Sequence, residues 1–521
     1  MAQKRKHIKV TYSNMSSPDP LLHQYYEEDV AAIKAELGKN YPMYINGTWR
    51  EGRSTFTKTS PIDTSMVIGH FQQGDAEDVA EAVVAAKAAF PAWRDTPWQE
   101  RVALLNKAAD LISERVFYLA AALSLEVGKN RMEAVGDAEE TADLIRYCTQ
   151  AMTDNNGFIR DLAAESERHH NRSVLKPHGV WGVISPFNFP CALSGGPSGA
   201  AMVAGNTVVH KPADDAPLTA YLLAQCFADA GIPAGVYNMV TGGDEAGKAL
   251  VAHPDVNGLT FTGSYNVGMS ILRNFAVAGS FARPVVAEMG GKNPTIITDK
   301  ADLDKASTGV LRAAFGLTGQ KCSACSRVYV HESVKDAFVQ KLVEKTNQIQ
   351  VGDPTEAQNW MGPAINEDAY RAYQHYVGDL GENGRILTGG KTLDKKGYYV
   401  APTVVTDLPA DHPLWKQEMF LPIVVVAGYT DKEQAMAEAN DVDFGLTAGF
   451  YSEDKAEVEW FLDNIEAGVL YVNRETGATT GAWPGYQSFG GWKGSTGTGK
   501  AAGSFYYLQQ YMKEQSQTVV D

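Results

Sequence analysis

Two cysteines in a CxxC spacing, Cys322 and Cys325, lie in the segment GLTGQKCSACSR at positions 316–327. Such a pair could be a redox-active disulfide, half of a zinc site, or one reactive thiol beside a packing residue. The remaining cysteines are isolated, at Cys148, Cys191 and Cys226. Because no second CxxC is present to complete a four-ligand zinc site, we expect no bound metal. The redox pair and the single nucleophile both stay open.

A carboxylate precedes this segment at the end of a predicted strand. Glu288 closes the run at 284–288 and stands just before the pair Gly290 and Gly291. It could be an ordinary charge at a strand exit or a general base that activates water. Only the thiolate form of a cysteine is nucleophilic, and we expect the adjacent Lys321 or a nearby helix N-terminus to lower the pKa of Cys322.

Two further segments could bind a nucleotide. The sequence FTGSYNVG at 261–268 joins a predicted strand to a predicted helix, where glycine lets the backbone approach a phosphate and the helix N-terminus presents unpaired N–H groups. The usual GxGxxG motif is missing, so an ordinary strand-to-helix turn stays an alternative. Lys211 and Asp214 follow another strand and could bind ribose hydroxyls, or could form a solvated loop with a helix N-cap.

A regular alternation of predicted strands and helices between residues 180 and 288 must position these residues. Strands are predicted at 180–185, 207–210, 236–240, 259–261 and 284–288, and helices at 193–204, 218–230, 245–253 and 265–276. This alternation implies right-handed crossovers and a parallel sheet covered on both faces. Because open α/β sheets bind ligands at the carboxyl ends of their strands, we expect the candidate residues to converge there.

A second strand and helix set follows Gly290, which predicts a second α/β domain. Its strands are predicted at 295–297, 328–330, 424–427 and 469–472, and its helices at 303–315 and 334–348. Long helices over 78–112 and 114–129, broken near Pro91 and Pro97, precede the first set. The extended segments at 172–175 and 505–511 fit neither domain, and such strands often pair with a neighbouring chain, so we predict a homo-oligomer.

Charge and composition narrow the possible partners. The 521 residues include 46 basic and 62 acidic side chains, which gives a net charge of −16 and opposes binding to nucleic acid or an anionic membrane. No apolar run reaches membrane-spanning length, and we interpret the basic opening MAQKRKHIKV as a solvated tail. Five scattered cysteines are typical of a reducing compartment, so a cytoplasmic location and a small-molecule partner are predicted.

From about residue 42 to residue 515, the chain resembles the NAD(P)-dependent aldehyde dehydrogenase superfamily. Six motifs occur in the family's order: SPFNFP at 185–190, KPAD at 211–214, FTGSYNVG at 261–268, EMGGKNP at 288–294, GQKCSA at 319–324 and FGG at 489–491. Glu288 also precedes Cys322 by 34 residues, as in the family. The resemblance implies two doubly wound parallel-sheet α/β domains, one Rossmann-like and one catalytic, plus a small β oligomerisation element.

Domain boundaries follow from the same resemblance. They place an N-terminal arm at 1–40, an NAD-binding domain at 41–160 and 181–290, an oligomerisation element at 161–180 and 500–521, and a catalytic domain at 291–499.

The resemblance also implies a reaction. Cys322 would attack an aldehyde, and the Asn188 amide and the Cys322 backbone N–H would stabilise the oxyanion of the thiohemiacetal. Hydride transfer would leave a thioester, and Glu288 would activate the water that hydrolyses it. The cofactor contacts implied are Ser185, Pro186, Phe187, Lys211, Asp214, Phe261, Gly263, Ser264, Val267, Glu418 and Phe420. Because the Asp214 carboxylate should repel a 2′-phosphate, NAD is expected rather than NADP.

The substrate expectation rests on two short segments. Lys321-Cys322-Ser323 and Thr480-Gly481-Ala482 resemble the family subgroup that oxidises L-glutamate γ-semialdehyde, the open form of 1-pyrroline-5-carboxylate. In that subgroup the serine and the Gly-Ala backbone anchor the substrate carboxylate, and two aromatic residues flank its chain. The substrate contacts implied are Phe189, Lys321, Ser323, Gly481, Ala482 and Phe489. A duplicated TGA, at 476–478 and 480–482, resembles an insertion in this loop.

Other interpretations stay open. The chain could oxidise a different semialdehyde or an aromatic or aliphatic aldehyde, whereas a CoA-acylating enzyme is less expected because Glu288 favours water as the acceptor. It could also be a non-catalytic binding protein that keeps the fold, or a redox switch through Cys322 and Cys325.

Overall fold

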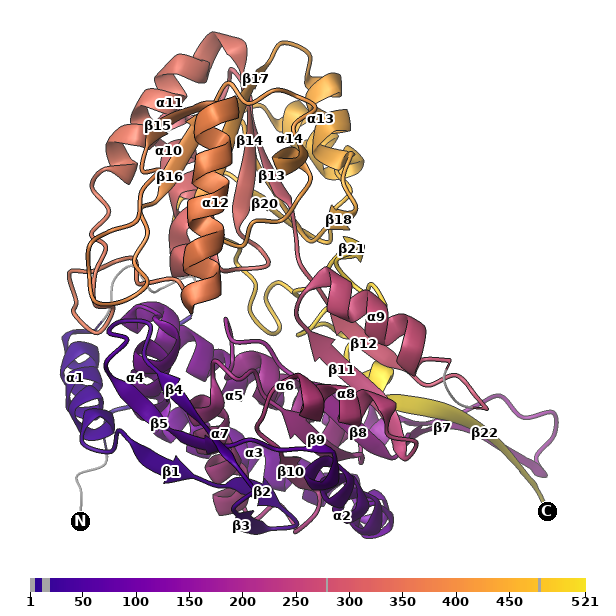
Figure 1. Ribbon diagram of the computed structural model, residues 1–521. Coiled ribbons are helices and arrows are strands. Elements are labelled where there is room, and N and C mark those ends of the chain that lie inside the picture. The colour runs from indigo at the N-terminus through magenta and orange to yellow at the C-terminus, as the bar shows by residue number, and fades with distance from the viewer. Residues whose placement is uncertain (1–4, 12–18, 278–279, 477–478) are drawn as a thin grey trace.

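The computed structural model describes residues 5–11, 19–277, 280–476 and 479–521. Figure 1 shows two α/β bodies, the first formed mainly by the N-terminal half of the chain, and a hairpin that projects to one side. Each body contains a seven-stranded, mainly parallel sheet. The fold class expected from the sequence is therefore confirmed.

The first sheet carries the predicted strand and helix alternation. Its strand order is β12-β11-β8-β9-β10-β2-β3. Its members are β8 (Val180–Ile184), β9 (Thr207–Lys211), β10 (Tyr237–Met239), β11 (Val256–Thr262), β12 (Val285–Glu288), β2 (Met43–Ile45) and β3 (Thr48–Arg50). The connecting helices are α6 (Ala192–Val203), α7 (Pro217–Ala230), α8 (Asp244–Ala252) and α9 (Tyr265–Phe275). Because β8 is the first of the parallel strands along the chain but central in space, the strand order reverses beside it, where such sheets bind ligands.

Long helices and a small sheet complete the first body. The helices are α1 (Pro20–Lys34), α2 (Ala76–Asp95), α3 (Trp98–Glu114), α4 (Val116–Val127) and α5 (Arg131–Asp154), and the strands are β1 (Lys39–Tyr41), β4 (Thr55–Thr59) and β5 (Val67–Gln72). The predicted break near Pro97 is confirmed, but the break near Pro91 is wrong, because Pro91 lies inside α2. Pro91 is on an exposed face, where water can satisfy the backbone carbonyl that proline leaves unpaired.

The second sheet begins only five residues after β12 ends. Its strand order is β15-β16-β17-β14-β13-β19-β20. Its strands are β13 (Asn293–Ile297), β14 (Cys325–His331), β15 (Arg385–Thr388), β16 (Thr403–Thr406), β17 (Ile423–Tyr429), β19 (Thr447–Tyr451) and β20 (Val469–Val472). Around it lie α10 (Leu303–Phe315), α11 (Glu332–Thr346), α12 (Glu367–Asn383), α13 (Lys432–Asn440) and α14 (Lys455–Asn464), and the short pair β18 (Phe444–Gly445) and β21 (Trp492–Lys493).

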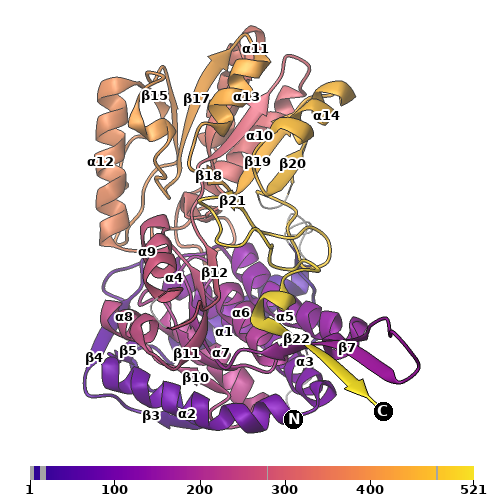
Figure 2. The same cartoon turned by 90° about the vertical axis from the view of Figure 1, so that its right-hand side faces the viewer.

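A three-stranded sheet projects from the first body (Figures 1 and 2). It has the order β22-β7-β6, with β6 at Ile159–Asp161, β7 at His169–Pro177 and β22 at Met512–Val520. The extended segment predicted at 505–511 is wrong, because Leu508–Tyr511 is a 3₁₀ turn and the strand follows it. Tyr511 is fully buried against Trp181, so its ring belongs to the core, whereas the polar residues after it pair with β7.

The N-terminal segment differs from the solvated tail expected for it. Residues 1–4 lie outside the described residues, but in 5–11 the side chains of Ile8 and Val10 are 8% and 3% exposed and belong to the main hydrophobic core. Residues 5–11, here called the N-terminal strap, therefore pack against the first body. Among the described residues, no helix combines the length and the apolar character needed to cross a membrane.

Candidate active site

A strained turn brings Cys322 to its position. After α10, Leu317 and Thr318 both have positive φ angles, of 49° and 58°, which are unfavourable for residues with a Cβ atom. Two contacts stabilise the turn, since Glu133 Oε2 accepts from the Leu317 N–H at 3.2 Å and Thr318 Oγ1 donates to the Gly362 carbonyl at 3.0 Å. Strained backbone of this kind concentrates at functional sites.

The surroundings of Cys322 disfavour its thiolate. Burial raises the pKa of the Cys322 thiol to about 12, and the nearby carboxylates of Glu418 and Glu288 act in the same direction. The expectation that Lys321 lowers this pKa is wrong. The Lys321 ammonium points to Glu133 instead, in a buried ion pair with Nζ and Oε1 2.9 Å apart.

Asn188 lies against the same turn. Its side-chain Nδ2 donates to the Gln320 carbonyl at 3.0 Å, and its Oδ1 accepts from the Phe189 N–H at 3.1 Å. These two contacts fix the orientation of the Asn188 amide. They also hold it against Gln320, which is two residues before Cys322 in the sequence. Because an amide nitrogen carries two hydrogens and Gln320 accepts only one of them, the second Nδ2 hydrogen is available to donate to a bound group.

Glu288 has the environment of a proton acceptor. Its Oε1 accepts from Thr496 Oγ1 at 3.0 Å, while Oε2 is buried and has no hydrogen-bond partner among the described residues. Burial raises the pKa of this carboxyl to about 8. A carboxylate in these surroundings binds protons more tightly than an exposed one, which suits a general base that works near neutral pH.

A second carboxylate, Glu418, lies near the thiol. Glu418 Oε1 accepts from the Gly291 N–H at 2.9 Å, and burial raises the pKa of this carboxyl. A Cβ atom at position 290 would lie 2.1 Å from Glu418 Oε2, so a larger residue there would displace this carboxylate. Phe420, with φ of 56°, meets Phe187 edge to face at a centroid distance of 6.0 Å.

The predicted cofactor residues other than Glu418 and Phe420 lie at the carboxyl edge of the first sheet, and their chemistry fits a dinucleotide. Lys211 Nζ and Asp214 Oδ1 are 2.9 Å apart just after β9. Ser264 is the N-cap of α9 but makes no side-chain capping bond, and the first turn of this helix has no acidic residue, so its N–H groups suit a phosphate. Val267 in the same turn is 49% exposed and offers apolar surface.

Ser185 is occupied by an internal hydrogen-bond chain. Its hydroxyl contacts His210 Nε2 and Ser194 Oγ, both at 2.8 Å, and His210 Nδ1 contacts the Tyr237 hydroxyl at 2.9 Å. Burial lowers the pKa of His210 to about 3, so this ring is neutral. The Ser185 hydroxyl therefore contributes to the interior of the sheet, beside Pro186 and Phe187.

A pocket opens at Cys322. Its cavity has a volume of about 70 Å³, which suits a small substrate. Five of the six predicted substrate residues line it: Phe189, Lys321, Ser323, Ala482 and Phe489. The sequence reasoning missed the other lining residues, which are Glu140, Ala192, Leu193, Thr479 and Thr480. The Asn130 N-cap and Glu133 could have marked the start of α5, the helix that supplies Glu140.

In the loop that follows β20, the backbone N–H groups expected to anchor a substrate carboxylate already have acceptors within the loop. The Gly481 N–H donates to Gln487 Oε1 at 3.0 Å, and the Ala482 N–H donates to Thr480 Oγ1 at 3.2 Å. A substrate carboxylate would therefore have to replace these acceptors. Of the duplicated TGA, Gly477 and Ala478 lie outside the described residues.

Cys325 belongs to the core. It is 1% exposed at the start of β14, and its Sγ lies 3.2 Å from Thr295 Oγ1. All five cysteines are free thiols. This placement favours Cys325 as a packing residue over a partner of Cys322.

A partly buried thiol near a carboxylate with one free oxygen, next to a Rossmann-like sheet, is typical of a dehydrogenase that works through a covalent bond to cysteine. The model of the aldehyde dehydrogenase family matches residues 49–517. The chain belongs to this family, whose members oxidise aldehydes, and the resemblance drawn from the six motifs is confirmed.

Three similar proteins refine the comparison. A 1-pyrroline-5-carboxylate dehydrogenase of Staphylococcus epidermidis is 36% identical over 493 residues, which cover 94% of this chain and 95% of that protein. The structure of a Thermus 1-pyrroline-5-carboxylate dehydrogenase with bound NAD has a TM-score of 0.94 at 32% identity, covering 100% of both chains. An NADP-dependent enzyme of E. coli has a TM-score of 0.86 at 31% identity, covering 92% of this chain and 98% of that one.

Proposed function

We propose that this enzyme oxidises L-glutamate γ-semialdehyde, the open form of 1-pyrroline-5-carboxylate, to L-glutamate with NAD. The observation that carries the proposal is the small pocket at Cys322, which Phe189, Ser323, Ala482 and Phe489 line together. Relatives named for this activity share 36% identity over more than nine tenths of the chain.

Three side chains divide the chemistry. Cys322 Sγ attacks the aldehyde carbon, and the Asn188 amide stabilises the oxyanion that forms. NAD, when bound, accepts the hydride and leaves an acyl group on the cysteine sulfur. Glu288 then takes a proton from the attacking water, which releases the carboxylate and restores the thiol. The unpartnered Oε2 of Glu288 is the oxygen available for this proton.

The cofactor residues support NAD over NADP. Lys211 and Asp214 would hold the adenosine ribose, Ser264 the pyrophosphate, and Glu418 and Phe420 the nicotinamide half. The Asp214 carboxylate would repel a 2′-phosphate, since like charges placed together cost several kcal/mol.

The projecting sheet supports assembly of several copies. β22 pairs with β7 on one side only and leaves its other edge open, and Val519 and Val520 on it are each 55% exposed. An open edge of this kind is a site for strand pairing with another chain. We propose a homo-oligomer that uses this edge; a cytoplasmic location stays a prediction.

The substrate proposal is tested by measuring NADH formation with 1-pyrroline-5-carboxylate and with butanal, each with NAD and with NADP. We expect kcat/KM for 1-pyrroline-5-carboxylate to exceed that for butanal at least about 100-fold, because butanal leaves the carboxylate anchors unpaired. NAD should be preferred to NADP at least about tenfold. Rapid turnover of butanal without turnover of 1-pyrroline-5-carboxylate would refute the substrate.

The reaction should accelerate with rising pH. Below its pKa of about 8 the Glu288 carboxyl is protonated and cannot accept a proton from water, and above it the group is ionised. The raised pKa of Cys322 acts in the same direction, because thiolate forms only as pH rises. We expect the rate of thioester hydrolysis, measured by single-turnover kinetics between pH 6 and 10, to increase about tenfold per pH unit up to pH 8. A rate that falls over this interval would contradict the role of Glu288.

A further inference from the structure

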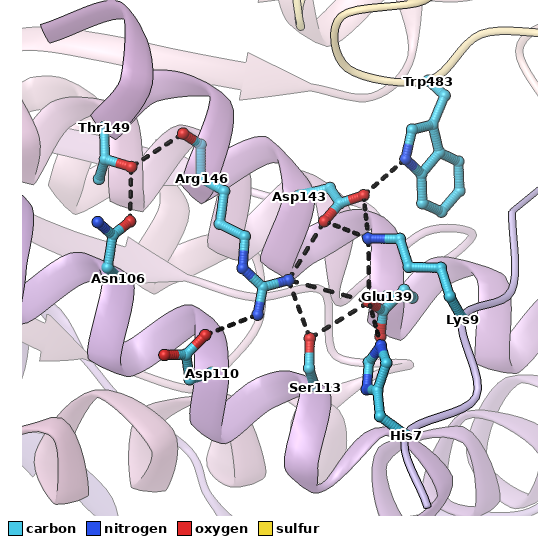
Figure 3. Close-up of polar contacts among 10 residues, drawn as sticks. All are labelled: His7, Lys9, Asn106, Asp110, Ser113, Glu139, Asp143, Arg146, Thr149 and Trp483. Carbon is cyan, nitrogen blue, oxygen red and sulfur yellow. Dashed lines mark hydrogen bonds and ion pairs between the residues drawn. The ribbon is translucent and has the colours of Figure 1, made fainter. Parts of the chain in front are cut away.

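A cluster of charged side chains connects the N-terminal strap to the substrate pocket (Figure 3). Its centre is α5, where Glu139 is fully buried and Asp143 is largely buried. The two carboxylates are four residues apart and therefore lie on the same face of the helix, where like charges are destabilising. One oxygen of Glu139, Oε2, has no hydrogen-bond partner among the described residues.

Lys9 of the strap bridges the two carboxylates. Its Nζ lies 2.6 Å from both oxygens of Asp143 and 3.3 Å from Glu139 Oε1. The buried neighbours Ile8 and Val10 hold the strap backbone on each side of Lys9. The strap therefore delivers a cation to a place that requires one.

The other charged groups around the cluster come from α3, α5 and the strap. Arg146 Nη1 lies 3.2 Å from Asp143 Oδ1 and 3.9 Å from Glu139 Oε1, and its Nη2 donates to Asp110 at 2.8 Å. His7 Nε2 lies 3.7 Å from Glu139 Oε1. Arg146 is also paired with Asp110. Lys9, in contrast, contacts both oxygens of Asp143 and Oε1 of Glu139.

Asp143 also holds the loop that carries Gly481 and Ala482. The Trp483 indole N–H donates to Asp143 Oδ2 at 2.7 Å, a short bond to a charged acceptor (Figure 3). Within this loop, here called the anchor loop and defined as residues 479–487, Gln487 closes the other end by donating to the Leu470 carbonyl at 2.8 Å. The loop is therefore fastened to β20 through Gln487 and to α5 through Trp483.

We propose that Lys9, Asp143 and Trp483 form a positioning chain through which the N-terminal strap sets the anchor loop for the substrate carboxylate. Lys9 neutralises Asp143, Asp143 fixes the indole of Trp483, and Trp483 directly follows the Gly-Ala segment. None of the three is among the residues that line the pocket at Cys322. The inference rests on the proposed function, because it assigns the anchor loop to the carboxylate of that substrate.

The test compares Lys9→Ala with the matched control Lys6→Ala. Lys6 belongs to the same strap but pairs with Asp19, at 2.8 Å, so its loss removes an equal charge away from the cluster. We expect Lys9→Ala to raise KM for 1-pyrroline-5-carboxylate about tenfold, with kcat and the KM for butanal unchanged. Lys6→Ala should match the wild type, and Lys9→Arg should recover most of the affinity. Trp483→Phe, which keeps a ring but loses the N–H, should act in the same direction as Lys9→Ala.

Equal losses with both aldehydes, or no effect of Lys9→Ala, would overturn the inference. If wild-type enzyme does not oxidise 1-pyrroline-5-carboxylate, the proposed substrate is wrong. The positioning chain is then tested on its own by hydrogen exchange of the anchor loop. Faster exchange at 479–487 in Lys9→Ala than in Lys6→Ala supports the positioning chain. Equal exchange in the two variants contradicts it.

Discussion

Replacement of Cys322 by alanine is expected to abolish NADH formation, with a loss of kcat of at least about 10³-fold. Without the sulfur no covalent adduct forms, and the oxyanion site and pocket that remain supply only a small part of the rate enhancement. The measurement is NADH absorbance under saturating aldehyde and NAD, with NAD binding followed by protein fluorescence to show that the variant is folded.

Cys325→Ala is the matched control for this prediction. It removes the same atoms three residues away, from a thiol that packs in β14 against Thr295. We expect this variant to keep most of the wild-type kcat. Unchanged activity in Cys322→Ala, or an equal loss in both variants, would show that Cys322 is not the nucleophile.

For Glu288→Gln we expect a separation of the two halves of the reaction. Glutamine has the same shape but cannot take a proton from water, so thioester hydrolysis should slow by about 10²- to 10⁴-fold, the usual contribution of general base catalysis. The first turnover does not need this base, so a burst of NADH should equal the concentration of active sites. Stopped-flow absorbance measures the burst and the slow rate that follows.

A carboxylate of the second body provides the comparison for Glu288→Gln. Glu457, on α14, pairs with Lys300 at 3.0 Å, and Glu457→Gln should retain both the burst and the steady-state rate. If Glu288→Gln loses the burst and the steady-state rate together, the side chain acts before hydride transfer, and its assignment to hydrolysis is wrong.

The strand and helix order could be predicted because each buried strand is a short apolar run bounded by glycine or polar residues. The predicted helix at 303–315 and the predicted strand at 469–472 match α10 and β20 at both ends. Cys322 and Glu288 were found through motif order and spacing, which are local properties of the sequence.

Contacts between distant residues could not be predicted in the same way. The partner of Lys321 is Glu133, 188 residues away, and only the packing of α5 against the turn before Cys322 brings them together. Likewise, Ile8 and Val10 stand among basic residues and could not be recognised as buried from the sequence. Their burial depends on the surface that they cover, which only the folded chain provides. The raised pKa values of Cys322 and Glu288 come from burial, which belongs to the folded chain and not to a local motif.

The regular turn of helix α5 decides on which side of the helix each of its carboxylates lies, and therefore which group each one meets. Its acids at Glu133, Asp137, Glu140 and Asp143 follow one another at intervals of three or four residues, so they lie along one side of the helix. They serve Lys321, Lys129, the pocket wall and Trp483 in turn. Inserting or deleting one residue in α5 would rotate every later carboxylate by about 100° and break these connections together. A change of length in the interior of α5 would thus break several contacts at once, whereas a substitution there acts on one contact at a time.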